Sequence, residues 1–235
     1  GISPEVERFF MFTTMVIAVP TGVKIFNWIA TMWGGSLNFK TPLLMGFGFL
    51  STFVVGGITG VVQGAIPLDA EVHNSYWVVA HFHYVLFGGS VFGIFGGLYY
   101  WMPKFTGKML DEKLGKLHFW TMFVGFNLTF FPMHILGLMG MPRRIAVYPD
   151  GRGWEVSNLV ATIGAFMIAL SVLIFIINYL GLARRPKAPE NPFEGNTLEW
   201  ATDSPPAEYN FKKIPVVTSA RPLWEARTGQ KDIEH

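Results

Sequence analysis

The chain has 235 residues, of which 51% are hydrophobic and 16% aromatic, while only 14% are charged. This composition is typical of a protein embedded in a lipid bilayer, and 26 glycines fit helices that pack closely in lipid. A formal net charge of +2 is too small to indicate nucleic-acid binding, and the absence of cysteine excludes disulfides and thiolate metal sites.

Five apolar segments are long enough to cross a bilayer, which takes about 20 apolar residues. We expect them at residues 9–33, 42–66, 77–101, 117–138 and 158–182. The sequence therefore predicts an all-α, polytopic membrane helix bundle over residues 1–183. Residues 184–235 are rich in proline and charge and contain no spanning run, so they are expected to form a surface tail.

The basic residues predict the orientation in a cell inner (plasma) membrane. Lys40 lies in the first connection, Lys104 in the third, and Arg184 begins the tail, while the second connection has no lysine or arginine. By the positive-inside rule, the first and third connections and the tail are cytoplasmic. Arg143 and Arg144 lie in the fourth connection, which should be external, so this pair indicates an anionic partner.

Two histidines, His81 and His83, lie inside the third apolar segment. An ionisable residue at membrane depth is costly and indicates function. Each helical residue turns by about 100°, so the two side chains face nearly opposite sides and serve separate ligands. Neutral imidazole is the usual axial ligand of haem iron, although the spacing leaves open another metal or a packing role. Glycines further along the segment allow a flat macrocycle or another helix to approach.

Two further groups stand out in or beside the apolar segments. Lys24 lies deep in the first segment, one helical turn after Thr21, which predicts a proton or ion relay or, alternatively, a snorkelling lysine. Asp69, Glu71 and His73 lie in the second connection. They are either a site for a hard cation or part of a solvated loop.

Residues 78–85 (VVAHFHYV) resemble the haem-binding helix of subunit I of the haem–copper terminal oxidases, most closely the bacterial cytochrome c oxidase type. Residues 17–24 (IAVPTGVK) resemble the helix with the proton-channel lysine. Residues 127–132 and 137–144 resemble the next helix and loop, and residues 197–201 with 204–206 resemble a bacterial tail. The similarity covers nearly the whole chain in order. It implies helices eight to twelve of a twelve-helix subunit.

The resemblance implies roles for the residues that match. His81 would be the proximal ligand of the high-spin haem, where oxygen binds, and His83 an axial ligand of the low-spin haem. Phe82 would lie between the two macrocycles, which are expected to be of the haem A type. Lys24 and Thr21 would belong to the proton path from the cytoplasmic side.

The resemblance also assigns the polar residues near the external ends of the helices. Arg143 and Arg144 would pair with haem propionates, and Asp69 would lie beside one of them. His73 would help to bind magnesium. Most cytochrome c oxidases have an aspartate directly after this histidine, and the neutral Asn74 in its place weakens a site for a hard cation.

The activity implied by the resemblance is reduction of dioxygen to water with electrons from cytochrome c, coupled to proton pumping. A quinol-oxidising member is the alternative, because residues 73–75 (HNS) resemble that type, whereas Tyr84 is similar to the cytochrome c type. A nitric oxide reductase-like relative and a cofactor-free proton relay that uses His81, His83 and Lys24 are further alternatives.

The family's copper ligands and its second low-spin haem ligand belong to earlier helices, and this chain contains none of them. The sequence is therefore expected to be a fragment lacking the copper-site helices. Its implied partners are the missing N-terminal helices, subunit II with the electron-entry site, subunit III, cytochrome c and the lipid bilayer. A truncated product with only a packing role remains an alternative for the isolated polypeptide.

Overall fold

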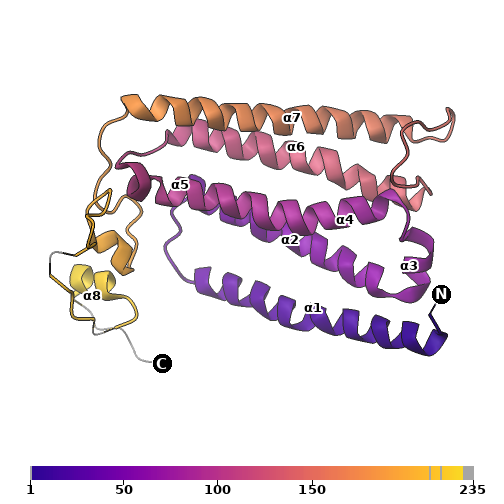
Figure 1. Ribbon diagram of the computed structural model, residues 1–235, viewed down its shortest axis with the longest axis horizontal. Helices are drawn as coiled ribbons and strands as arrows, with labels where there is room; N and C mark the ends of the chain where they lie inside the picture. The colour runs from indigo at the N-terminus through magenta and orange to yellow at the C-terminus, as the bar shows by residue number, and fades with distance from the viewer. Residues whose placement is uncertain (1, 212, 218, 230–235) are drawn as a thin grey trace. The chain divides into compact units, whose positions relative to one another are not determined.

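The computed structural model describes residues 2–211, 213–217 and 219–229, and the elements within these ranges are helices joined by loops (Figure 1). Five helical segments in the described part are long and apolar enough to cross a membrane. They cover Pro4–Met32, Thr41–Gly64, Tyr76–Thr106, Glu112–Leu138 and Glu155–Arg184. The prediction of an all-α bundle with five spanning helices is therefore confirmed.

Helices α1 (Pro4–Met32) and α2 (Thr41–Gly64) form the first hairpin, and each has a proline in its first turn. Proline favours this position because its fixed φ suits a helix and its missing N–H would have no partner there. The same signal at Pro67 starts a short helix, α3 (Ile66–Val72), inside a stretch that we expected to be a connection. None of the α1 side chains is buried, and α1 packs on α2 and α3.

The third span is interrupted, whereas the sequence predicted one continuous helix. It consists of α4 (Tyr76–Leu86), a π-helical turn (Phe87–Val91) and α5 (Phe92–Thr106). Such π turns occur mostly as single turns within α-helices, often at functional sites. A Cβ on Gly88 in this turn would lie 2.5 Å from Thr52 Oγ1, so glycine lets α2 approach here. Apolar periodicity does not reveal the interruption, because all residues around it are apolar or small.

Helix α4 packs against α2 and α6 (Glu112–Leu138), and α6 packs against α7 (Glu155–Leu180). Small residues allow the close approach of α6 and α7. A Cβ on Gly164 would lie 2.5 Å from the backbone nitrogen of Thr129, and one on Gly125 would lie 3.0 Å from the Gly164 carbonyl oxygen. This use of glycine is typical of helices that associate in lipid, where van der Waals packing replaces the hydrophobic driving force.

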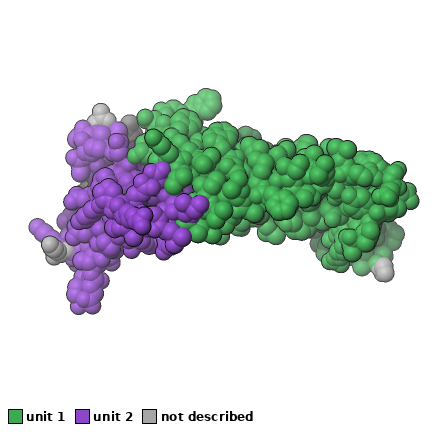
Figure 2. Space-filling model, turned by 90° about the horizontal axis from the view of Figure 1, so that it is seen from above, with its two compact units in different colours: residues 1–96, 112–176 green, residues 97–111, 177–235 purple. Residues whose placement is uncertain are grey.

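The chain divides into two compact units (Figure 2). The first contains residues 1–96 and 112–176, and the second contains residues 97–111 and 177–235. In the second unit, Trp200 is buried on the short 3-10 helix Leu198–Ala201, and its Nε1 donates to the Tyr100 hydroxyl at 2.8 Å. Lys104 Nζ donates to the Thr202 carbonyl at 2.6 Å. The region after residue 184 therefore has a folded core around Trp200.

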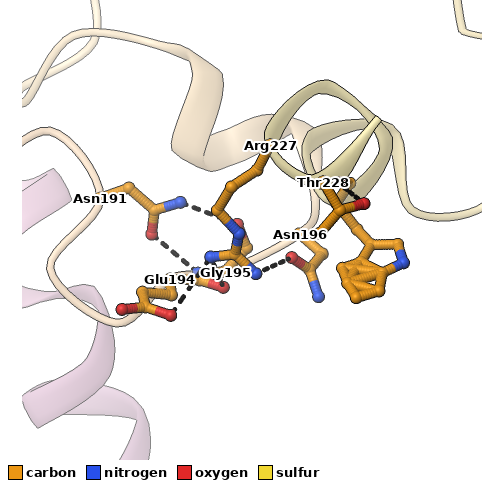
Figure 3. A network of polar contacts seen from close by, with 7 residues as sticks. Asn191, Glu194, Gly195, Asn196, Arg227 and Thr228 are labelled. Atoms are coloured by element: carbon orange, nitrogen blue, oxygen red, sulfur yellow. Dashed lines mark hydrogen bonds and ion pairs between the residues drawn. The ribbon is translucent and has the colours of Figure 1, made fainter. Parts of the chain in front are cut away.

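A polar network links the loop before Trp200 to α8 (Pro222–Thr228), as Figure 3 shows. The Asn191 side chain accepts from the backbone N–H of Gly195 at 2.7 Å and donates to its carbonyl at 2.8 Å. Arg227 of α8 contacts the Glu194 carboxylate and the Asn196 side-chain oxygen, each at 3.3 Å. The Asn191 contacts therefore fix the loop conformation locally, and Arg227 joins this loop to α8, 33 residues after Glu194 and 31 after Asn196.

Gly137, near the end of α6, provides a test of the packing between α6 and α4. A Cβ at this position would lie 2.2 Å from the backbone nitrogen of Trp77, which cannot move aside as a flexible side chain can. We expect Gly137→Ala to lower the unfolding free energy by about 1–3 kcal/mol, the usual cost of overpacking. Thermal unfolding of the purified complex in detergent measures this change.

Gly93→Ala is the matched control, because a Cβ there meets no atom within 4 Å. Alanine favours a helix over glycine by about 0.5–1 kcal/mol, so this control should be neutral or slightly stabilising. Equal melting temperatures for the two variants would contradict the close approach at Gly137.

Candidate functional site

His81 lies half-buried on α4 and faces α2. Its Nδ1 is 3.0 Å from the carbonyl oxygen of Gly56 and 3.2 Å from Thr59 Oγ1. Because a carbonyl oxygen only accepts, Nδ1 must carry the hydrogen, and Nε2 keeps its lone pair. Histidines that bind metals usually donate the other ring N–H in this way, which fixes both the tautomer and the ring orientation.

His83 has the same arrangement on a different side of the helix. Its Nδ1 is 2.7 Å from the carbonyl oxygen of Val79, one turn earlier on α4. Its ring stacks on Phe130 of α6, with centroids 4.1 Å apart and planes at 13°. The two imidazoles therefore face different neighbours, α2 for His81 and α6 for His83, and each has an Nε2 lone pair available for a ligand. Phe82 lies between the two histidines in sequence and contacts the His83 ring, with ring centroids 4.4 Å apart.

A cavity of about 500 Å³ lies beside His81, with a lining drawn mainly from α1 and α2. Thr21 of α1 is one of its few polar residues, and the Thr21 hydroxyl donates to the carbonyl of Ile17 at 3.0 Å. Lys24 is exposed on α1 and does not line this cavity. The structure thus brings Thr21, but not Lys24, to the space beside His81.

A second cavity, of about 660 Å³, also touches His81 and reaches toward α3. Asp69 and His73 line it together with Glu7 from α1 and Gln63 from α2. These groups give the cavity that His81 lines a polar wall near α3. Asp69 and His81 therefore line the same cavity.

The magnesium site expected at His73 is not assembled from the described residues alone. His73 Nδ1 donates to the backbone carbonyl of Asp69 at 3.0 Å, within its own helix turn. Among the described residues, no group of three or more histidine, aspartate and glutamate side chains is close enough to hold a metal ion. Any cation bound at His73 would need further ligands from outside these residues, so the site stays a prediction.

The Arg143–Arg144 pair lies in a loop fastened to the start of α4. The backbone N–H of Arg143 donates to the Asn74 carbonyl, and that of Tyr76 donates to the Met141 carbonyl, both at 2.9 Å. Arg143 Nε is buried and has no hydrogen-bond partner among the described residues. A buried, unpaired charged donor is costly, so this guanidinium suits an anion that the described chain does not supply.

Three contacts around the histidines were not predicted from the sequence. They are the Thr59 hydroxyl near His81, the stacking of Phe130 on His83, and a hydrogen bond from the Tyr84 hydroxyl to Asn127 Oδ1 at 2.8 Å. The resemblance did cover the segment with Asn127 and Phe130. Nothing in its spacing shows, however, which of its side chains meet α4.

The chain is similar in sequence to proteins of a known family. Residues 1–167 match the family model described as Cytochrome C and Quinol oxidase polypeptide I. The chain is 52% identical over 219 residues to cytochrome c oxidase subunit 1 of Thermostichus vulcanus and 50% identical over 236 residues to that of Bacillus sp. (strain PS3). These alignments cover 93% and 99% of this chain, and 39% and 38% of the relatives.

The fold is also similar to that of a solved heme-copper terminal oxidase dimer determined by cryo-EM. The TM-score is 0.68 at 21% identity, over 81% of this chain and 39% of that one. The chain belongs to the Cytochrome C and Quinol oxidase polypeptide I family, and it spans about two fifths of the length of the curated relatives it matches. Membership implies haem and copper as the family's cofactors.

The residues of this chain fit a haem on two grounds that the structure shows. Each histidine has its Nδ1–H tied to a backbone carbonyl, which is the arrangement that leaves Nε2 as an axial ligand. The buried, unpaired Nε of Arg143 suits a carboxylate such as a haem propionate. The described residues do not offer a comparable histidine cluster for copper.

Proposed function

We propose that this chain is the C-terminal part of the oxygen-reducing subunit of a respiratory terminal oxidase. The complete enzyme would reduce dioxygen to water with electrons from cytochrome c and couple this reaction to proton pumping. The observation that carries the proposal is the pair of imidazoles on α4. Each has its Nδ1 tied to a backbone carbonyl and its Nε2 available, and the two face different helices.

In this proposal His81 holds the high-spin haem and His83 holds the low-spin haem. When bound, the two haems and copper supply the redox chemistry and the position at which dioxygen reacts. His81 would hold the high-spin haem through its Nε2, and His83 would hold the low-spin haem through its Nε2. Both proposed ligands lie on α4 with Phe82 between them, so this one helix would hold the two haems near each other. Haem A is the type that the resemblance implies.

The polar residues at the external end of α4 would hold the charged edges of the haems. Arg143 and Arg144 neutralise propionates, and Asp69 lies beside one of them at the cavity that touches His81. His73 contributes one ligand to a magnesium ion whose other ligands come from partner chains. The copper ligands are supplied by the preceding helices of the same subunit.

Protons for water formation would enter from the cytoplasmic side along α1. Thr21 lines the cavity beside His81, and Lys24 lies one helical turn further along. In the described chain Lys24 is exposed, so other helices of the subunit would have to enclose it. The proposed role of Lys24 is to carry a proton between the cytoplasmic end of α1 and the threonine hydroxyl.

The chain is a membrane-embedded protein, and we propose that its tail faces the cytoplasm of a cell inner membrane. The positive-inside pattern of Lys40, Lys104 and Arg184 supports this orientation. The complete complex would contain subunit II, which carries the electron-entry site, and subunit III.

The proposed electron donor is cytochrome c, and a quinol is the alternative. The family model covers both cytochrome c and quinol oxidases, while the two relatives above are named cytochrome c oxidases. We expect the purified complete complex to consume oxygen with reduced cytochrome c and not with a ubiquinol or menaquinol analogue. Turnover with quinol alone would identify the quinol-oxidising alternative, which the sequence at Asn74 favours.

The haem assignment predicts two distinct optical signals in the complete complex. A reduced-minus-oxidised spectrum should show two haems, of which carbon monoxide shifts only one. His81→Ala should remove the signal that responds to carbon monoxide, and His83→Ala should remove the other. A complete, folded complex without haem absorption would contradict the proposal and leave the cofactor-free proton relay.

Gly60 of α2 allows the role of His81 to be tested without removing its side chain. A Cβ on Gly60 would lie 2.9 Å from His81 Cε1. Gly60→Ala should therefore displace the imidazole and weaken or abolish the carbon monoxide response, while the low-spin signal persists. Gly57→Ala on the same helix is the control, since a Cβ there meets no atom within 4 Å. The same loss in both variants would mean that α2 acts on His81 only through general helix packing.

A further inference from the structure

We propose that Phe130 of α6 is a positioning residue that sets the orientation of the His83 imidazole plane, with the Tyr84–Asn127 hydrogen bond holding α4 in register. This inference rests on the proposed function, because it takes His83 as a ligand of the low-spin haem. It goes further by assigning the control of that ligand's geometry to one face of α6.

The His83 ring needs more than its hydrogen bond to be oriented. The Nδ1–H bond to the Val79 carbonyl, 2.7 Å long, fixes the direction of one ring atom but allows the ring plane to tilt about that direction. Phe130 removes this freedom, because its ring lies nearly parallel to the imidazole at 13° and 4.1 Å. Phe82 contacts the same imidazole, with ring centroids 4.4 Å apart and planes at 32°, so two aromatic rings contact the ligand.

Phe130 is itself held firmly. It is 8% exposed and contacts Phe126 and Phe87, with ring centroids 5.0 and 6.0 Å away. Because both neighbours are also rigid aromatic side chains, the face that Phe130 presents to His83 has little room to move. The orientation of the imidazole therefore depends on α6 and not only on its own helix.

The Tyr84–Asn127 pair sets the rotation of α4 at the same level. Tyr84 directly follows His83, is fully buried, and donates to Asn127 Oδ1 at 2.8 Å. Asn127 uses its Nδ2 to donate to the Phe123 carbonyl at 2.8 Å, which fixes the amide. Asn127 and Phe130 are three residues apart and so lie on one face of α6. One face of α6 thus fixes the angle of α4 and the plane of the adjacent ligand.

The orientation of an axial imidazole has a direct spectroscopic consequence. The angle between the planes of the two axial ligands changes the splitting of the iron d orbitals, and with it the g values of the oxidised low-spin haem. Surroundings that hold an axial ligand are a recognised means by which a protein adjusts its haem. A change in the orientation of the His83 ring plane should therefore alter the electron paramagnetic resonance spectrum even when His83 stays bound to the iron.

The test compares four variants of the complete, oxidised complex by electron paramagnetic resonance. Phe130→Met replaces the ring by a flexible apolar side chain, and Phe130→Tyr keeps the ring. Tyr84→Phe deletes one oxygen atom. Phe119→Met is the matched control, because Phe119 is buried on the same helix and its ring contacts are with Phe92, Trp120 and Phe123, away from His83.

We expect Phe130→Met to shift the largest g value of the low-spin haem and to broaden its signal. Tyr84→Phe should give a smaller shift, and Phe130→Tyr and Phe119→Met should match the wild type. An unchanged spectrum in Phe130→Met, or an equal shift in Phe119→Met, would overturn the inference. If the Phe130→Met complex does not assemble, the Tyr84→Phe complex is the test. An unchanged largest g value in Tyr84→Phe, or an equal shift in Phe119→Met, would then overturn the inference. A wild-type complex without a low-spin haem signal would instead contradict the proposed function.

Discussion

The absence of water from the bilayer interior is the constraint on which the arrangement around α4 depends. A histidine N–H at that depth must find its partner within the protein, and both histidines find a backbone carbonyl, Gly56 for His81 and Val79 for His83. Each bond fixes one tautomer and leaves the opposite nitrogen with its lone pair. The same desolvation that makes these histidines costly thus prepares them as neutral ligands.

The neighbouring helices α2 and α6 determine the surroundings of the two imidazoles. Helix α2 can lie close to α4 because it carries glycine where side chains would collide. A Cβ on Gly56 would lie 3.0 Å from the backbone of Tyr84, and one on Gly60 would lie 2.9 Å from the His81 ring. At the level of His83, helix α6 instead presents a bulky side chain, since Phe130 covers the His83 ring. Glycine on one side and aromatic packing on the other would give the two imidazoles different surroundings.

Much of the fold follows from the sequence because hydropathy and helix length are local signals. The five spans and the opposite directions of His81 and His83 could be predicted in this way. The π turn at Phe87–Val91 could not, because glycine and apolar residues suit both helix types. The contacts of Thr59, Phe130 and Asn127 also escaped prediction. They join residues that are distant in sequence, and only the tertiary packing decides which of many similar side chains meet.

The most direct test of the central claim is an experimental density map of the complete complex around α4. The account predicts two separate haem densities on different sides of this helix, one next to Nε2 of His81 and the other next to Nε2 of His83. Both Nδ1 atoms should remain at hydrogen-bond distance from the carbonyls of Gly56 and Val79. Density on only one side of α4, or a metal bonded to Nδ1 of either histidine, would contradict it.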